Sequence, residues 1–149
     1  MKKAVFLLGL LIPVFLSSCE KDEFSGTEAE KIDQYIASKN LIVTESTSTG
    51  LQYIRTKDGT GSSLKTTQFV TLKYTGKLLS EKVFDSGSFG FILGVGQVVR
   101  GFDEGVAKMK VGEQATIIFP SNLGYGNTKQ GSIPKNSPLI FEIEILAAE

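Results

Sequence analysis

The strongest constraint on the fold is an alternation of apolar and polar residues close to the C-terminal end of the sequence. Along residues 139–145 every second residue is apolar, and a glutamate fills two of the intervening positions. Successive side chains of a strand point to opposite faces, so this pattern predicts a strand with one buried face. Similar alternation at residues 51–56, 69–78 and 114–119 predicts three more strands.

A single short helix interrupts these strands. From Arg100 to Met109, the residues Phe102, Val106 and Met109 recur at the i, i+4 and i+7 spacing of one helix face. The sequence therefore predicts an α+β fold, in which an antiparallel sheet wraps around one short helix.

Another short helix is expected ahead of the sheet, from Thr27 to Asn40. Thr27 and Glu30 have the spacing of a capping box, which satisfies free N–H groups at a helix start. Its apolar residues are few, and they recur at helical spacing: Ile32, Tyr35 and Ile36. This narrow face predicts packing on the domain or on a partner.

The front of the chain has the features of a targeting segment. Lys2 and Lys3 precede a short apolar stretch at residues 4–16, as in a secretory signal peptide. The segment ends Leu16-Ser17-Ser18-Cys19, which resembles a bacterial lipobox, and Cys19 is the only cysteine. We expect lipidation of Cys19; the alternative is an ordinary signal peptide that contains a cysteine.

Three segments follow from these features. Residues 1–18 are a lipoprotein signal peptide, residues 19–50 carry the lipidated cysteine, a tether and the short helix, and residues 51–149 form the folded domain. Residues 24–27 and 44–50 are expected to be linker. The acidic run Glu20–Glu23 is either a solvated spacer or resembles an export signal of surface lipoproteins. The expected location is the bacterial cell envelope, with the lipid anchor at the outer membrane, on its periplasmic face or at the cell surface.

Several kinds of chemistry are excluded by composition. The chain has no histidine, which removes imidazole catalysis and histidine metal sites, and Cys19 is assigned to the lipid. Its 16 basic and 16 acidic residues balance, so no nucleic-acid surface is expected. No nucleotide-binding loop is present, and the pair Asp103-Glu104 is expected to be solvated surface. We expect neither a cofactor nor a metal.

A series of small motifs gives the sequence its functional signal. They are Tyr74-Thr75-Gly76, Val83-Phe84-Asp85-Ser86, Val98-Val99-Arg100-Gly101-Phe102, Gly124-Tyr125-Gly126, Ile133-Pro134 and Leu139-Ile140-Phe141. In this order and spacing they resemble the FK506-binding-protein (FKBP) type of peptidyl-prolyl cis-trans isomerase. The resemblance covers about residues 50–149 and implies an FKBP-like twisted sheet around one helix.

The resemblance also implies a role for each matching residue. Asp85 matches a buried carboxylate at the pocket rim, Tyr125 a hydroxyl that binds a substrate carbonyl, and the Val99 N–H a second carbonyl donor. Phe102 matches the pocket floor, where the best-known members have tryptophan. The remaining lining positions are Tyr74, Phe84, Phe89, Val98, Ile133 and Phe141.

Each of these residues also has an ordinary interpretation. Tyr74, Phe84 and Phe141 occupy alternating strand positions and would fit a plain core. Asp85 before Ser86-Gly87 is typical of a turn. The family interpretation depends on the whole set rather than on one residue.

Two functions remain open from the sequence. The first is a lipid-anchored isomerase that assists folding of exported proteins at X–Pro bonds. The second is a proline-peptide binding module or chaperone with little catalytic role. Expected partners are proline-containing polypeptides, FK506-like macrolides and the membrane through its lipid, and a monomer is expected.

Overall fold

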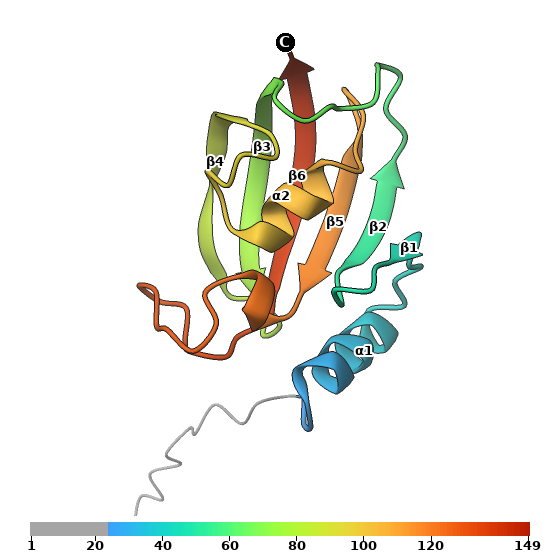
Figure 1. Ribbon diagram of the computed structural model, residues 1–149. Helices are drawn as coiled ribbons and strands as arrows, with labels where there is room; N and C mark the ends of the chain where they lie inside the picture. The colour runs from blue at the N-terminus through green and yellow to red at the C-terminus, as the bar shows by residue number, and fades with distance from the viewer. Residues whose placement is uncertain (1–23) are drawn as a thin grey trace, which may run out of the picture.

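The computed structural model describes residues 24–149, which form a six-stranded antiparallel sheet in the order β1-β2-β5-β6-β3-β4 (Figure 1). The elements, in chain order, are α1 (Glu28–Ser38), β1 (Glu45–Ser46), β2 (Gln52–Lys57), β3 (Phe69–Leu78), β4 (Val83–Ile92), α2 (Arg100–Val106), β5 (Gln114–Phe119), η1 (Ser121–Leu123, a 3₁₀ turn) and β6 (Leu139–Ala148). The predicted α+β class is confirmed.

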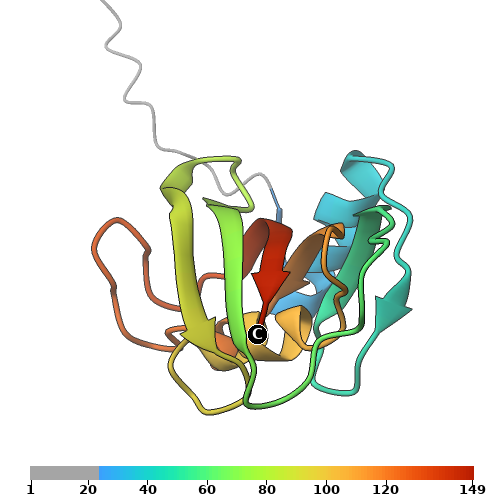
Figure 2. The same ribbon diagram turned by 90° about the horizontal axis from the view of Figure 1, so that it is seen from above.

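The sheet curves around α2, which lies in its hollow (Figure 2). Two glycines allow this close approach. A Cβ atom on Gly101 would lie 2.4 Å from the Phe119 ring, and one on Gly105 would lie 2.6 Å from Ile117. The helix ends at Val106, shorter than the predicted 100–109, and Met109 is fully buried in the turn that follows.

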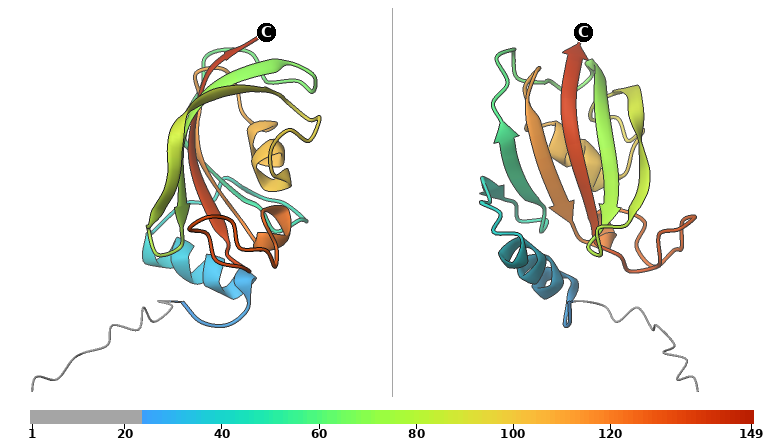
Figure 3. Two further views of the ribbon diagram at one scale, coloured as in Figure 1. Left: turned by 90° about the vertical axis from the view of Figure 1, so that its left-hand side faces the viewer. Right: turned by 180° about the vertical axis from the view of Figure 1, so that it is seen from behind.

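Apolar side chains pack on both faces of the central strands. The inner core lies between the sheet and α2 and includes Leu72, Ile117 and Ile143. A second core lies under α1, where Ile32 and Tyr35 contact Ile118 and Ile140 on the opposite face (Figure 3). This explains why Ile140 breaks the apolar–polar alternation of β6: its face is covered by α1.

The capping box of α1 is confirmed, since the Thr27 hydroxyl accepts from the Glu30 N–H and the Glu30 carboxylate accepts from the Thr27 N–H. The flanking linker predictions are wrong in part. Phe24 is buried, with its ring edge-on to Tyr35 at 6.0 Å. Residues 44–50 contain β1, which pairs with β2. The burial of Phe24 and the pairing of β1 with β2 therefore hold the chain on both sides of α1 to the domain.

Strand β4 is not predicted from the sequence. It pairs with β3 along almost its whole length, and Asp85 lies opposite Gly76 within this pairing. The interpretation of Asp85 as a turn residue is therefore wrong. Residues 85–88 are poor strand formers, and their extended backbone is held by the hydrogen bonds of β3.

The predicted signal peptide, Cys19 and the acidic run lie outside the described residues. Within residues 24–149, no helix has the length and apolar character needed to cross a membrane.

Candidate functional site

Six aromatic side chains from β3, β4, α2 and β6 meet on the concave side of the sheet. This aromatic cluster consists of Tyr74, Phe84, Phe89, Phe91, Phe102 and Phe141. Phe102 is central: its ring centroid lies 5.0 Å from that of Phe141, 5.9 Å from Phe89 and 6.2 Å from Tyr74. Several of the pairs are edge-on, a favourable arrangement for aromatic rings.

Burial divides this cluster into a base and a wall. Phe102, Phe141 and Phe91 are almost fully buried, whereas Tyr74, Phe84 and Phe89 are half-buried. The base therefore stays dry while the wall reaches the surface. Phe102 lies in this buried base, and its role as the floor of a binding pocket stays a prediction.

Gly76 allows two of the rings to meet above β3. A Cβ atom at this position would lie 2.6 Å from the Phe84 ring and 2.9 Å from Phe141. The two rings are 5.6 Å apart and edge-on. This role of Gly76 is not among the predicted ones, although a glycine inside a strand pattern is the signal for such a close approach.

A hydrogen bond joins Tyr74, in the wall of the cluster, to Asp85 at its exposed edge. The Tyr74 hydroxyl donates to Asp85 Oδ2 at 2.6 Å, and the Ser86 N–H donates to Asp85 Oδ1 at 2.9 Å. The bond to Asp85 raises the pKa of Tyr74 to about 12, helped by partial burial and by the nearby acidic groups Asp85 and Tyr125. Asp85 is an exposed residue, so the expectation of a buried carboxylate is wrong.

The start of α2 packs against the same core as the aromatic cluster. Val98 and Val99 are half-buried against the inner core, and the Val99 carbonyl begins the helix by accepting from the N–H groups of Phe102 and Asp103. The donor role expected for the Val99 N–H stays a prediction.

The acidic pair on α2 is not free surface. Asp103 Oδ1 accepts from the Gly94 N–H at 2.7 Å, and Glu104 Oε1 accepts from the Thr49 hydroxyl at 2.7 Å. Both carboxylates fix neighbouring loops to the helix, which corrects the sequence interpretation.

Residues 120–138, the Tyr125 loop, connect β5 to β6 beside the aromatic cluster. Tyr125 is 37% exposed, so part of its side chain is accessible to a ligand. Ile133 is buried, and its N–H and carbonyl are both hydrogen-bonded to Gln130, at 2.8 and 3.0 Å. The loop thus has a fixed base in the inner core and an exposed tyrosine.

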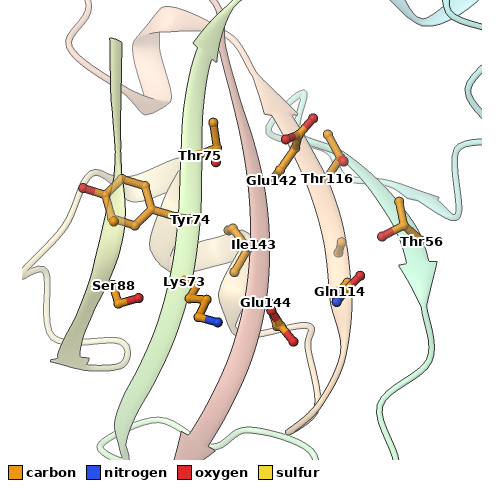
Figure 4. Close-up of a pocket in the computed structure, with 12 residues that line it drawn as sticks. Thr56, Lys73, Tyr74, Thr75, Ser88, Gln114, Thr116, Glu142, Ile143 and Glu144 are labelled. Carbon is orange, nitrogen blue, oxygen red and sulfur yellow. The ribbon is translucent and has the colours of Figure 1, made fainter. Parts of the chain in front are cut away.

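A second hollow lies on the opposite face of the sheet. It measures about 610 Å³ and is lined mainly by polar side chains, including Lys73, Gln114, Glu142 and Glu144 (Figure 4). Such a lining does not suit an apolar proline ring. The aromatic cluster is therefore the better candidate site.

The predicted site residues mostly come together. Tyr74, Phe84, Phe89, Val98, Val99, Phe102, Ile133 and Phe141 all pack in or against the inner core. Asp85 joins them through Tyr74. Tyr125 joins them through its electrostatic effect on Tyr74. Cys19 lies outside the described residues. No group of three acidic, cysteine or histidine side chains suited to a metal occurs between residues 24 and 149.

Comparison with known proteins identifies the family. The family of FKBP-type peptidyl-prolyl cis-trans isomerases matches residues 61–146. The chain belongs to the FKBP family. It is 36% identical over 138 residues to the FKBP-type isomerase FkpA of Aeromonas hydrophila, covering 90% of this chain and 52% of FkpA. It is 41% identical over 103 residues to FK506-binding protein 1 of Dictyostelium discoideum, covering 65% of this chain and 96% of that protein.

Solved structures of the family share the fold. FkpA from Escherichia coli superposes with a TM-score of 0.72 at 29% identity, over 83% of this chain and 59% of FkpA. AtFKBP13 superposes with a TM-score of 0.64 at 32% identity, over 70% of this chain and 97% of AtFKBP13. The chain thus spans about half the length of the Aeromonas FkpA and nearly all of the smaller FKBPs.

Proposed function

We propose that this chain is a peptidyl-prolyl cis-trans isomerase that acts at X–Pro bonds of exported proteins. The observation that carries the proposal is the aromatic cluster, whose wall is half-buried, with the Tyr74–Asp85 hydrogen bond at its edge. Membership of the FKBP family supports the reaction type.

The reaction suits a site without strong acid–base groups. Isomerisation is rotation about a partial double bond, with a barrier of about 20 kcal/mol, and no covalent bond changes. The planar amide is more dipolar than the twisted one, so an apolar pocket favours the twisted transition state. Groups that hold the flanking carbonyls in the twisted geometry add differential binding.

Each part of the site has a role in this proposal. Phe102 and Phe141 receive the proline ring, and Tyr74 and Phe89 form the wall beside it. The Tyr125 hydroxyl and the Val99 N–H bind the carbonyls on either side of the rotating X–Pro bond. Asp85 fixes the Tyr74 hydroxyl, which keeps that donor from competing for the substrate.

The test is cis–trans exchange of a short Xaa-Pro peptide measured by NMR with residues 20–149, which include both packed cores. Wild type should accelerate exchange. Tyr125→Phe and Phe102→Leu should each lower kcat/KM by about tenfold, because each loses a contact made in the transition state. Asp85→Asn should lower it by about as much, because it weakens the bond that fixes the Tyr74 hydroxyl. Asp33→Asn, on the exposed face of α1, is the matched control.

A folded wild type that leaves the exchange rate at its spontaneous value would refute the enzyme. Binding of the same peptide without turnover would then support the alternative, a proline-peptide binding module or chaperone.

We further propose that the pocket binds FK506-like macrolides, as the name of the Dictyostelium relative states for that protein. Competition between FK506 and the peptide tests this. FK506 that leaves exchange unchanged at saturating concentration would contradict it.

The proposed location is the bacterial envelope, through lipid on Cys19 at the outer membrane. The lipobox-like residues Leu16-Ser17-Ser18-Cys19 support it. Wild type expressed from residue 1 should take up labelled fatty acid and fractionate with outer membranes, whereas Cys19→Ser should do neither. A wild-type chain recovered unlabelled in the aqueous fraction would contradict the anchor.

A further inference from the structure

Helix α1 is hydrogen-bonded to the Tyr125 loop. Glu28, its first residue, accepts two hydrogen bonds from Ser121: the Ser121 N–H donates to Oε2 at 2.6 Å, and the Ser121 hydroxyl donates to Oε1 at 2.7 Å. Ser121 begins η1, and the start of α1 lies beneath it (Figure 3). Both carboxylate oxygens of Glu28 are thus used by a segment far away in the sequence.

Ser121 in turn holds the backbone on either side of Tyr125. Its carbonyl accepts from the N–H of Gly124 and from the N–H of Gly126, each at 2.8 Å. Gly126 has a φ of +57°, a left-handed conformation that few other residues adopt easily. One residue therefore fixes the turn that presents Tyr125, and that residue is bound to Glu28.

The Glu28–Ser121 contact is partly shielded from water. Ser121 is 5% exposed and Glu28 is half-buried. Hydrogen bonds to an ionised carboxylate are about twice as strong as neutral ones, and exclusion of water strengthens them further. An acidic residue in a first turn also favours the helix through its dipole. Helix stability alone does not account for the orientation of both Glu28 oxygens toward another element.

Other contacts hold α1 in place independently of Glu28. Ile32 is buried in the second core, and the Tyr35 hydroxyl donates to Glu81 Oε1 at 2.6 Å in the turn between β3 and β4. Replacing the Glu28 carboxylate should therefore leave the helix docked and affect mainly the Tyr125 loop.

We propose that Glu28 is a positioning residue for Tyr125. Through Ser121 it restricts the turn Gly124–Gly126, so that the Tyr125 hydroxyl is held where a substrate carbonyl arrives. The proposal rests on the isomerase function above and adds to it a residue from outside the region matched by the family, residues 61–146. Pre-organised groups bind a transition state without first losing conformational freedom, so loosening the turn should slow turnover.

The test compares Glu28→Gln, Ser121→Ala and Tyr125→Phe, alone and combined, with Asp33→Asn as the matched control on α1. Glutamine keeps the size of Glu28 but offers only one acceptor oxygen. In Glu28→Gln and Ser121→Ala, ¹⁵N relaxation should show increased motion at residues 124–131, with unchanged ring signals of Phe89 and Phe102. The control should match wild type.

Kinetics provide a second readout. Glu28→Gln should lower kcat/KM by about three- to tenfold, mostly through kcat. In the Tyr125→Phe background the same substitution should have no further effect, because the hydroxyl that it positions is gone. General destabilisation would lower activity equally in both backgrounds.

Unchanged loop motion in Glu28→Gln, or an equal loss of activity in the Tyr125→Phe background, would overturn the proposal. An inactive wild type would refute the isomerase function separately. Loop motion and the affinity for the Xaa-Pro peptide would then decide the role of Glu28.

Discussion

The hydrogen bond between Tyr74 and Asp85 leads to a prediction about the pKa of the Tyr74 hydroxyl. Asp85 is the main cause of the raised pKa of Tyr74, which is about 12. Asp85→Asn removes both the charge and the strongest acceptor, so the pKa of Tyr74 should fall towards the usual tyrosine value of about 10. NMR titration of the ring carbons measures it, with Asp33→Asn as the control. An unchanged Tyr74 titration would show that burial, and not Asp85, holds the proton.

Glu113 is the one fully buried carboxylate among residues 24–149, and no sequence motif marks it. It accepts from the Tyr53 hydroxyl, from Arg55 Nε at 2.9 Å and from the Lys110 N–H at 3.0 Å. Glu113→Ala would leave these donors without their acceptor. We expect the free energy of unfolding to fall by about 1–3 kcal/mol. Urea unfolding measures the change.

Glu113→Gln should lose less stability, since its amide oxygen still accepts. Equal stability of wild type and Glu113→Ala would mean that water replaces the carboxylate at no cost.

Helix α1 is packed as part of the folded domain. Ile32 is 2% exposed and packs with Ile118 and Ile140, which are buried on the outer face of the sheet. Ile32→Ala should therefore lower the free energy of unfolding by about 2–5 kcal/mol in a single cooperative transition. The exposed Asp33→Asn on the same helix should change it by less than about 0.5 kcal/mol. Two separate transitions would show that α1 unfolds independently.

The helices and most strands could be predicted because local patterns specify them. The capping box marks the start of α1, and alternation marks β3, β5 and β6. Strand β4 lacks such a pattern: Asp85, Ser86 and Gly87 favour turns, and pairing with β3 overrides this preference. The early end of α2 and the presence of β1 likewise depend on tertiary contacts.

The candidate site could be predicted only as far as the order and spacing of the motifs along the sequence indicate it. The aromatic residues named from the family resemblance lie together, because strand alternation directs Tyr74 and Phe141 to one face. The exposure of Asp85 and the Glu28–Ser121 bond were not predictable. Both depend on how distant segments pack, and no local spacing encodes that.

From the shifted pKa values we expect the stability of the whole protein to vary little over a broad range of pH. The pKa values of Tyr35 and Tyr53 are raised by burial and by bonds to Glu81 and Glu113, and that of Tyr74 by Asp85. A tyrosine whose pKa is raised by folding contributes its full stability below the pKa of the unfolded state, about 10. That contribution is lost as the pH rises through the pKa of the folded state.

At acidic pH the stability changes in the opposite direction, because the group concerned is a carboxyl group with a lowered pKa. The Tyr35 hydroxyl lowers the pKa of Glu81, so its contribution is present above the unfolded value of about 4.3 and is lost as pH falls. With no histidine in the chain, thermal unfolding should vary little between about pH 6 and 9. Circular dichroism melts measure it, and a steep change inside that window would contradict the prediction.

The central place of β6 affects when the protein can fold during its synthesis. Residues 139–148 lie between β5 and β3, so β1, β2 and β5 have no hydrogen-bonded link to β3 and β4 until β6 arrives. Pairing between segments distant in sequence is slow, because loop closure precedes the contacts that reward it. A nascent chain that lacks residues 139–148 therefore cannot complete the sheet, and we expect the domain to fold only after β6 has been synthesised.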